Sequence, residues 1–226
     1  MKFLITESQY RRILKESQLP QITNREIVDL VIDKLEGGYY DPNKHRKPQM
    51  LDSGETMFGM DRKHGDFEKS SEGQEFWSLI DAEKQKDPEK WKHYYKLDDN
   101  PSLSNKLKDL IHKGYVDAKF NQWSSAYKLD PEVKKIVEND PRLKFHMYYG
   151  LWNGPGWFKK YAKALNDAYS RGITDPTELF QIGMGSRLNS GNKLIARSGR
   201  KIQDIFKDTE TLDSYAKTSK KMTTVA

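Results

Sequence analysis

An Asp or Asn residue stands directly before proline at five positions beyond residue 80, and this pairing constrains the fold more than any other feature. The dipeptides begin at Asp87, Asn100, Asp130, Asp140 and Asp175. An Asx side chain can cap the free N–H groups that open a helix, and proline fits the first helical turn because it lacks an N–H. From residue 72 onward we expect helices near 72–84, 88–96, 102–113, 130–138, 141–150, 155–171, 176–183 and 192–207.

The first part of the chain combines one strong helix with a non-helical segment. Thr23 and Glu26 have capping-box spacing, a broad apolar face follows, and Gly37-Gly38 ends the helix. Residues 39–60 lack helical periodicity, and we expect a loop and a small β-hairpin there, with 56–58 as strand. The predicted fold class is therefore mainly α (α+β), with a small hairpin after this helix.

The chain divides into three parts by composition. Residues 6–17 read as a short amphipathic helix, and Ser17–Pro20 breaks it, so residues 1–20 form a predicted arm that packs on the body or docks on a partner. Residues 21–210 form one domain with a helical C-terminal part. Residues 211–226 form a Ser/Thr/Lys-rich tail, which we expect to be frayed.

Several functions are excluded by what the sequence lacks. It has no Cys, and its five His form no His-x-x-x-His pair, so we expect neither a metal site nor a cofactor. It has no Gly-x-Ser-x-Gly elbow of a serine hydrolase. Its start is too polar for a signal peptide, and no run is apolar enough for a membrane helix. We expect synthesis in a cytoplasm and no membrane insertion.

The positive charge is concentrated in the C-terminal part. Residues 141–226 hold 15 Lys and Arg against 7 Asp and Glu, whereas residues 1–140 hold 24 against 26. An anionic cell-wall polymer, nucleic acid and a membrane surface are candidate partners for such a region, and a merely solvated basic face is the alternative. No nucleic-acid motif supports the second option. The side chains in question are Arg187, Lys193, Arg197, Arg200 and Lys201.

Glu36 is the first candidate for chemistry. It ends the helix that begins after Thr23, and two glycines follow. The helix macrodipole is negative at a C-terminus, so it disfavours the carboxylate and tends to raise the pKa of a Glu there. Desolvation by Leu35 acts in the same direction. A protonated carboxylic acid is what a glycosidase needs as general acid, although an ordinary solvated Glu before a helix end gives the same local pattern.

The segment 52–60 supplies candidates for a second group. Its sequence, Asp-Ser-Gly-Glu-Thr-Met-Phe-Gly-Met, places Asp52, Glu55 and Thr56 on the predicted hairpin. A hairpin that faces a helix end can bring a second carboxylate, or a hydroxyl that positions water, close to the acid. Whether the reaction retains or inverts configuration depends on the carboxylate separation, which the sequence leaves open.

These segments resemble glycoside hydrolase family 108, whose members are lysozyme-like N-acetylmuramidases, largely from phages and bacteria. Leu35–Tyr39 and Asp52–Met60 are similar to the family's Glu-Gly-Gly-Tyr and Gly-Gly-Glu-Thr-x-x-Gly-Ile segments, and Leu151–Gly156 to its Val-Asn-x-Gly-Pro segment. The resemblance implies a lysozyme-like helical fold with Glu36 as the catalytic acid. It covers residues 24–66 well, 141–160 moderately, and the rest poorly.

The chain departs from the family pattern at several places. The spacer 43–51 is longer and more basic, Ser53 and Met60 replace preferred residues, and residues 85–130 have no counterpart. By analogy with phage lysozymes, Asp52 and Thr56 are the expected catalytic partners, whereas Glu55 either contacts substrate or buttresses the hairpin. The expected substrate-binding residues are Gly37, Gly38, Tyr39, Tyr40, Glu55, Phe58, Trp152 and Asn153.

The resulting expectation is an enzyme that hydrolyses peptidoglycan between N-acetylmuramic acid and N-acetylglucosamine, without a cofactor. A lysozyme without a signal peptide fits a phage endolysin, or a virion-associated lysin whose segment 6–17 docks on virion proteins. It would be made in the host cytoplasm and act on the cell wall. The alternatives are a lytic transglycosylase and a non-catalytic structural or wall-binding virion protein.

Overall fold

The computed structural model describes residues 22–41, 54–63, 66–189 and 193–207. In these ranges the chain is mainly helical, with a small antiparallel hairpin after the first described helix, so the predicted fold class is confirmed. The predicted helix 6–17, Asp52 and the tail 211–226 lie outside the described residues.

The structure has the following elements. The α-helices are α2 (Asn24–Lys34), α3 (Ser71–Lys86), α4 (Pro101–Ile111), α5 (Asp117–Ala126), α6 (Pro131–Asn139), α7 (Pro141–Trp152), α8 (Pro155–Tyr169), α9 (Pro176–Leu188) and α10 (Lys193–Lys207). The strands are β1 (Thr56–Met57) and β2 (Met60–Asp61), η1 (Lys90–Lys92) is a 3₁₀ turn, and η2 (His112–Val116) is a π-helical segment.

The helix starts follow the predicted chemistry. Thr23 and Glu26 form the capping box of α2. Asn100, Asp130, Asp140 and Asp175 each cap a helix with their side chain and are followed by proline in the first turn. These side chains accept hydrogen bonds from backbone N–H groups that have no partner inside the helix, which is why Asx-Pro marks these starts.

Two predictions of helix position are wrong. Residues 88–96 contain only the short turn η1, because Asp87 lies at the C-terminal end of α3 instead of opening a new helix. Conversely, the unexpected helix α5 continues from α4 through η2. Gly114 lies in η2, and a Cβ added to it would be only 2.5 Å from the Cβ of Glu72. Gly114 therefore allows η2 to pack closely against α3, whereas the sequence had suggested that the helix ends near this glycine.

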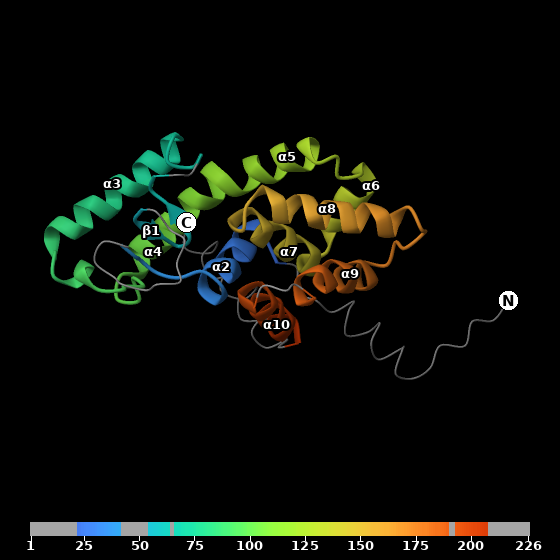
Figure 1. The fold of residues 1–226 in the computed structure, drawn as a ribbon. Coiled ribbons are helices and arrows are strands. Elements are labelled where there is room, and N and C mark those ends of the chain that lie inside the picture. The colour runs from blue at the N-terminus through green and yellow to red at the C-terminus, as the bar shows by residue number, and fades with distance from the viewer. Residues whose placement is uncertain (1–21, 42–53, 64–65, 190–192, 208–226) are drawn as a thin grey trace.

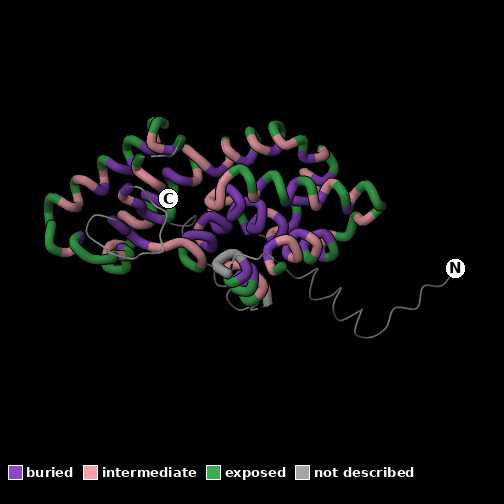
Figure 2. The backbone as a smooth tube through the Cα atoms, viewed as in Figure 1, coloured by how far each residue is buried: buried purple, intermediate pink, exposed green. Residues whose placement is uncertain are grey.

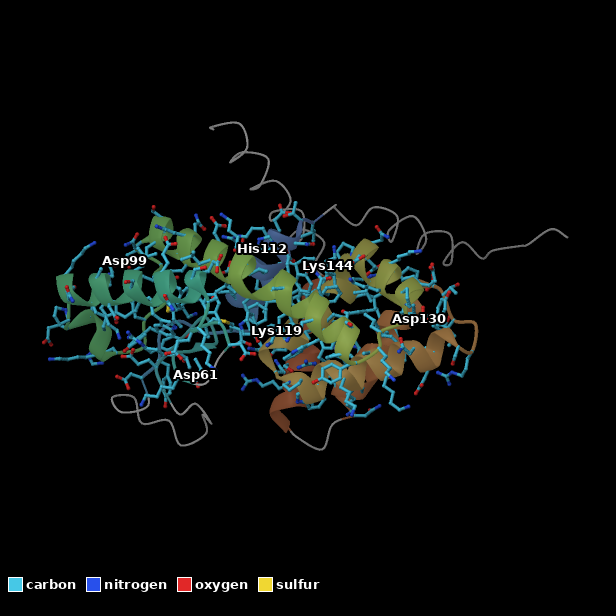
Figure 3. The ribbon with its side chains drawn as sticks, turned by 90° about the horizontal axis from the view of Figure 1, so that it is seen from above. Asp61, Asp99, His112, Lys119, Asp130 and Lys144 are labelled. Atoms are coloured by element: carbon cyan, nitrogen blue, oxygen red, sulfur yellow. The ribbon has the colours of Figure 1, made fainter. Side chains whose placement is uncertain are left out.

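The molecule is elongated, with α2 and α7 at its centre (Figure 1). The hairpin, α3 and α4 lie at one end, and α6, α8 and α9 lie toward the other. Asp99 and Asp130 lie toward these opposite ends, with His112 and Lys119 between them (Figure 3). Helix α7 packs against α2, α5, α6, α8 and α9, so it joins the helices of the second end to the helix that carries Glu36.

Buried residues follow the inner faces of the helices along the whole molecule (Figure 2). They form one apolar cluster that runs from the hairpin through α2 and α7 to α10. Phe145 and Tyr148 of α7 and Phe158 and Tyr161 of α8 belong to it. Phe158 and Tyr161 are both fully buried. A continuous core of this kind fixes the position of α7 relative to α2.

The hairpin turns within two residues, Phe58 and Gly59. Met57 pairs with Met60 across the turn, and both turn residues have positive φ, 54° and 74°. Two-residue hairpins favour this conformation because its twist matches that of the strands, but a residue with a Cβ is strained in it. Phe58 adopts this strained conformation, and its backbone carbonyl accepts a hydrogen bond in the candidate site.

Candidate active site

Glu36 follows the last turn of α2. The N–H groups of Leu35 and Glu36 both donate to the carbonyl of Val31, at 3.0 and 3.1 Å, so the helix ends at this point. The preceding helix is anchored in the core by Leu30, Val31 and other buried residues. Glu36 itself is half-buried. The helix therefore places the carboxylate at its C-terminal end while leaving it partly open to solvent.

The hairpin turn and α7 meet at this carboxylate. A Cβ on Gly59 would lie 2.5 Å from Glu36 Oε2 and 2.6 Å from Trp152 Cδ1. Both distances are below any real Cβ contact, so a side chain at position 59 would displace one of these groups. The Glu36 carboxylate and the Trp152 indole thus both lie against the bare backbone of Gly59. Two segments far apart in the sequence form one surface there.

Trp152 is held from two sides. Its Nε1–H donates to the carbonyl oxygen of Phe58 at 3.0 Å, which ties α7 to the hairpin turn. On another side the Tyr115 ring meets the indole edge to face, with 6.2 Å between ring centroids. The Tyr115 hydroxyl donates to the carbonyl of Leu151 at 3.2 Å. Because Tyr115 belongs to the π-helical segment η2, this irregular turn fixes the end of α7 beside Glu36.

Tyr149, one turn before Trp152, connects the site to the interior. Burial raises the pKa of Tyr149, and the Glu36 carboxylate adds to this shift through its negative charge. Arg187 and side-chain hydrogen bonds with Asn153 and Ser198 act in the opposite direction. Tyr149 thus lies within electrostatic reach of both Glu36 and Arg187. Asn153 is half-buried, and its Nδ2 donates to the carbonyl of Tyr149 at 3.0 Å.

Gly37 and Gly38 have a packing role. A Cβ on Gly38 would lie 2.1 Å from the carbonyl oxygen of Tyr95, and one on Gly37 would lie 2.9 Å from the Tyr94 hydroxyl. The Gly38 N–H also donates to that hydroxyl at 2.8 Å. Next along the chain, Tyr39 N–H donates to the Tyr95 carbonyl at 2.6 Å. The two glycines let the chain leaving α2 run against residues 94–96.

Glu55 is engaged by three donors. Its carboxylate accepts hydrogen bonds from Tyr39 at 2.9 Å, Arg62 at 2.9 Å and Lys84 at 2.6 Å, and Arg62 is also paired with Asp81. Burial works against ionisation, but these hydrogen bonds outweigh it and lower the pKa of Glu55 to about 2. These contacts favour a structural role for Glu55 over contact with substrate, because they link the hairpin to α3.

Three aromatic residues that were expected to bind substrate are covered by the protein instead. Tyr39 is 0% exposed, packs edge to face on Trp91 at 4.9 Å, and has Lys84 Nζ 4.5 Å from its ring centre. Tyr40 and Phe58 are each 4% exposed. Rings that are covered in this way offer no face to a saccharide. The sequence does not distinguish an aromatic residue of a surface site from one of the core.

The remaining expected site residues are placed as follows. Thr56 opens β1, is buried, and exchanges two backbone hydrogen bonds of 2.8 Å with Tyr40. Trp152 is half-buried and contacts the surface around Glu36. Asp52 lies outside the described residues. The structure therefore brings Glu36 and Trp152 together, with Asn153 on the same turn as Trp152.

Arg187 does not belong to the basic surface expected in the C-terminal region, whereas Arg197, Arg200 and Lys201 are exposed. Arg187 is 0% exposed, and its guanidinium lies among Tyr149, Trp157 and Tyr161. In sequence it looked like the other basic residues of this region, although its neighbours in α9 are largely small or apolar. The sequence patterns had assigned no role to Gly59, which lies beside Glu36, or to Tyr115, Tyr149 and Arg187, which lie at or contact the end of α7.

Within the described ranges, no group of three or more His, Asp or Glu side chains is arranged to hold a metal ion. Nor does any helix in those ranges have the length and apolar character needed to cross a membrane. Comparisons with family models, with curated proteins and with solved structures found no match to this chain.

Proposed function

We propose that this chain is a lysozyme-like peptidoglycan hydrolase that cleaves the bond between N-acetylmuramic acid and N-acetylglucosamine, with Glu36 as general acid. One observation carries the proposal. The three segments singled out in the sequence, namely the end of α2, the hairpin turn and the end of α7, converge on the Glu36 carboxylate through Gly59 and Trp152. These contacts are independent of the sequence resemblance that suggested the activity.

The surroundings of Glu36 suit acid catalysis. The carboxylate and the Trp152 indole both lie against the backbone of Gly59, and Glu36 remains half-buried, so it is partly desolvated yet within reach of a ligand. In the proposed reaction the Glu36 proton passes to the glycosidic oxygen as the bond from C1 to that oxygen breaks. A water molecule supplies the new oxygen at C1, and the proton that it releases restores the protonated Glu36, directly or by way of solvent and the partner group. The reaction thus consumes one water and needs no cofactor.

The second group is proposed to lie on the segment before β1. Asp52 would act as the carboxylate partner that activates water or stabilises positive charge at C1, and Thr56 at the start of β1 is the alternative. The contacts of Glu55 favour a supporting role, because its carboxylate already accepts from Tyr39, Arg62 and Lys84. Peptidoglycan would be the partner and the bacterial cell wall the site of action.

The test is clearing of purified peptidoglycan by the wild-type protein, by Glu36→Gln, and by Glu89→Gln as a matched control. Glu89 is a largely exposed glutamate, with 78% of its side chain accessible, and it lies in the connection after α3. We expect wild type and Glu89→Gln to clear the suspension, and Glu36→Gln to be at least about 100-fold slower, as for loss of a general acid. The circular dichroism of all three proteins should agree.

Two results would contradict this proposal. If the folded wild-type protein leaves peptidoglycan intact, the enzyme hypothesis fails and a wall-binding or structural role takes its place. If Glu36→Gln clears as fast as the wild type, Glu36 is not the acid. Mass spectrometry of the fragments then identifies the bond, since a hydrolase leaves a reducing end and a lytic transglycosylase leaves an anhydro end.

A further inference from the structure

Arg187 of α9 is a completely buried cation with two unused donor atoms. Its Nη1 donates to Asn153 Oδ1 at 3.0 Å and to Ser198 Oγ at 2.7 Å. Among the described residues no carboxylate lies within ion-pair distance of the guanidinium, and its buried Nε and Nη2 have no hydrogen-bond partner. Burial of an ion without a counter-ion costs free energy, which two hydrogen bonds offset only in part.

The rings around Arg187 do not supply the missing negative charge. Tyr149, Tyr161 and Trp157 form a cage, with their ring centres 4.6, 5.3 and 5.7 Å from the guanidinium Cζ. Burial raises the pKa of both tyrosines and lowers that of His146, so these groups are uncharged at neutral pH. The cation–π contacts reduce the cost of the buried charge but do not neutralise it.

The guanidinium lies at the start of α8. It donates to Asn153, which directly precedes the N-cap residue of this helix, and its Cζ approaches the ring of Trp157 in the first turn. These two contacts flank residues 154–156 on both sides in sequence. The buried charge of Arg187 is therefore directed at the N-terminus of a 15-residue helix, where the macrodipole is also positive.

The start of α8 presents bare backbone. Its N-cap, Gly154, makes no side-chain hydrogen bond to the helix, and Cβ atoms added to Gly154 and Gly156 would meet nothing within 4 Å. Pro155 has no N–H, and the N–H of Trp157 already donates to the Gly154 carbonyl at 3.1 Å. The Gly156 N–H is thus the backbone donor that this first turn offers to a ligand.

Two lysines add positive charge to the surface around this turn. Lys159 and Lys160 of α8 are exposed. Lys160 Nζ donates to the carbonyl of Ser186 at 3.2 Å and lies 4.9 Å from the ring centre of Trp157, which keeps it beside the first turn. The Trp157 ring thus has the exposed Lys160 and the buried Arg187 as neighbours. The charges and the helix dipole all favour an anion here.

We propose that the start of α8 is a binding site for a carboxylate, held by the Gly156 N–H and by the positive charge of Arg187. One backbone donor and one buried cation suit a group with a single charge, whereas a phosphate carries more charge and is usually cradled by several N–H groups. The site adjoins the candidate active site, because Trp152, whose indole lies against Gly59 as the Glu36 carboxylate does, directly precedes Asn153.

The source of the carboxylate rests on the proposed function. In peptidoglycan, short peptides that carry carboxylates branch from N-acetylmuramic acid. Gly156 follows Trp152 by four positions, so their α-carbons are at most about 15 Å apart. A peptide of two to four residues spans about 7–14 Å when extended. A stem peptide therefore reaches the start of α8 from a glycan that lies beside Trp152.

The experiment titrates the isotope-labelled wild-type protein with N-acetylmuramyl-L-alanyl-D-glutamate and with its uncharged diamide. Each probe holds a single sugar, so binding is measured without turnover. We expect the acid to shift the backbone amide NMR signals of Gly156 and Trp157, and to bind at least about tenfold more tightly than the diamide. Added salt should weaken binding of the acid. Equal affinities, or shifts that leave out Gly156, would overturn the inference.

Gly156→Asp and Gly156→Asn form a matched pair of variants. Both side chains fit, because an added Cβ meets nothing there, and they have nearly the same size. Asp places a resident carboxylate in the site, so it should weaken binding of the acid at least about tenfold and leave the diamide unchanged. Asn should stay within about twofold of the wild type. Equal binding of the acid by the two variants would count against the site.

Arg187→Met tests the buried charge, because an unbranched apolar chain replaces it in the cage. The acid should bind at least about fivefold more weakly and the diamide as before. The control is Lys159→Met, which removes an exposed cation screened by solvent and should change binding by less than about twofold. A folded Arg187→Met that binds the acid like the wild type overturns the role of Arg187. If this variant does not fold, the Gly156 pair still decides whether the site exists.

Two further results identify the ligand and separate this inference from the proposed function. Inorganic phosphate should shift the Gly156 signal less than the acid at equal concentration, and a larger shift would overturn the assignment to a carboxylate. If the wild type clears peptidoglycan but binds acid and diamide equally, only this inference fails. If it leaves peptidoglycan intact but prefers the acid at Gly156, only the proposed function fails.

Discussion

Two glutamates of the same region differ in what surrounds them. Glu55 accepts hydrogen bonds from a tyrosine, an arginine and a lysine, and its pKa falls to about 2. Glu36 lies against the backbone of Gly59, which the Trp152 indole also approaches. Environment, and not residue type, therefore separates the structural carboxylate from the candidate catalytic one.

The first prediction concerns the stability that Glu55 provides. Glu55→Gln should lower the free energy of unfolding at pH 7 by about 1–2 kcal/mol, a value reduced because solvent reaches part of the cluster. The pKa of Glu55 is lower in the folded state than in the unfolded chain, so its contribution is complete above about pH 4.3. It is lost as the pH falls toward 2.

Urea unfolding at pH 7, 4 and 2.5 measures this contribution. The difference between wild type and Glu55→Gln should shrink steadily as the pH falls through this range. The control is Glu89→Gln, in which the exposed Glu89 loses only a surface pair with Lys92. A difference that stays constant from pH 7 to 2.5 would contradict the assigned cluster.

The second prediction concerns Gly59. In Gly59→Ala the methyl group would meet both the Glu36 carboxylate and the Trp152 ring, in addition to the cost of a positive φ. We expect a loss of about 1 kcal/mol in stability and at least a tenfold loss of activity. Gly172→Ala is the matched control, because Gly172 also has a positive φ of 85° but nothing within 4 Å of its added Cβ. It should lose less stability than Gly59→Ala, because only the positive φ acts there, and it should keep its activity.

At the scale of elements, the site depends on two irregular connections. The first is the chain leaving α2, where Gly37 and Gly38 allow contact with residues 94–96. The second is the π-helical segment η2, which carries Tyr115 to the end of α7. Regular helices set the positions of Glu36 and Trp152, and these connections hold the two helix ends together.

The third prediction separates the two adjacent glycines. In Gly38→Ala the new Cβ would overlap the backbone carbonyl of Tyr95, which cannot move without breaking its hydrogen bond with Tyr39. We expect a loss of at least about 2 kcal/mol in stability. In Gly37→Ala the obstacle is the outer end of the exposed Tyr94 side chain, which can rotate away more easily than a backbone carbonyl, and the loss should be less than half as large. Thermal unfolding of the two variants tests this order, and equal losses would contradict it.

The sequence predicted elements best where the determinants are local. Thr23, Asp130 and Asp175 cap helices in the way their spacing indicates, because a cap involves only neighbouring backbone groups. The helix α5 was missed since Gly114 reads as a break, whereas its actual partner is Glu72 on another helix. Asp87 lies at the C-terminal end of α3. It is followed by proline, as the Asx residues that open helices are, so the local sequence does not distinguish the two cases.

The site was predictable only in part for the same reason. Glu36 was found from its place at a helix end, and Trp152 from its motif. The burial of Tyr39 depends on Trp91 and Lys84, which no local pattern connects to it. The cage of Arg187 combines side chains of α7, α8 and α9 and a hydroxyl from α10, so its existence is a property of tertiary packing.

At the scale of the whole molecule, α7 is the central helix and its burial has a pH cost. His146 of α7 is 2% exposed, and its Nε2 has no hydrogen-bond partner. Desolvation and the nearby Arg187 hold the pKa of His146 well below its usual value. The folded protein therefore keeps His146 neutral, while the unfolded chain takes up a proton below about pH 6.5.

The fourth prediction follows from this difference. Because the unfolded state binds the additional proton, the wild-type free energy of unfolding should fall below about pH 6.5, by up to roughly 1.4 kcal/mol per pH unit. His146→Gln should lose most of that dependence between pH 6.5 and 5. His93→Gln, at an exposed position in the connection after η1, should keep it. Urea unfolding across this range is the measurement, and identical slopes for wild type and His146→Gln would contradict the assignment.

The convergence of Glu36, Gly59 and Trp152 also has a consequence for synthesis. These residues are spread from the end of the first described helix to the end of α7, so a growing chain carries Glu36 long before the residues that surround it have been made. The carboxylate acquires its neighbours only when α7 has left the ribosome and packed. A chain that ends before α7 would carry the acid without the residues that surround it, so the site can assemble only in chains that extend through this helix.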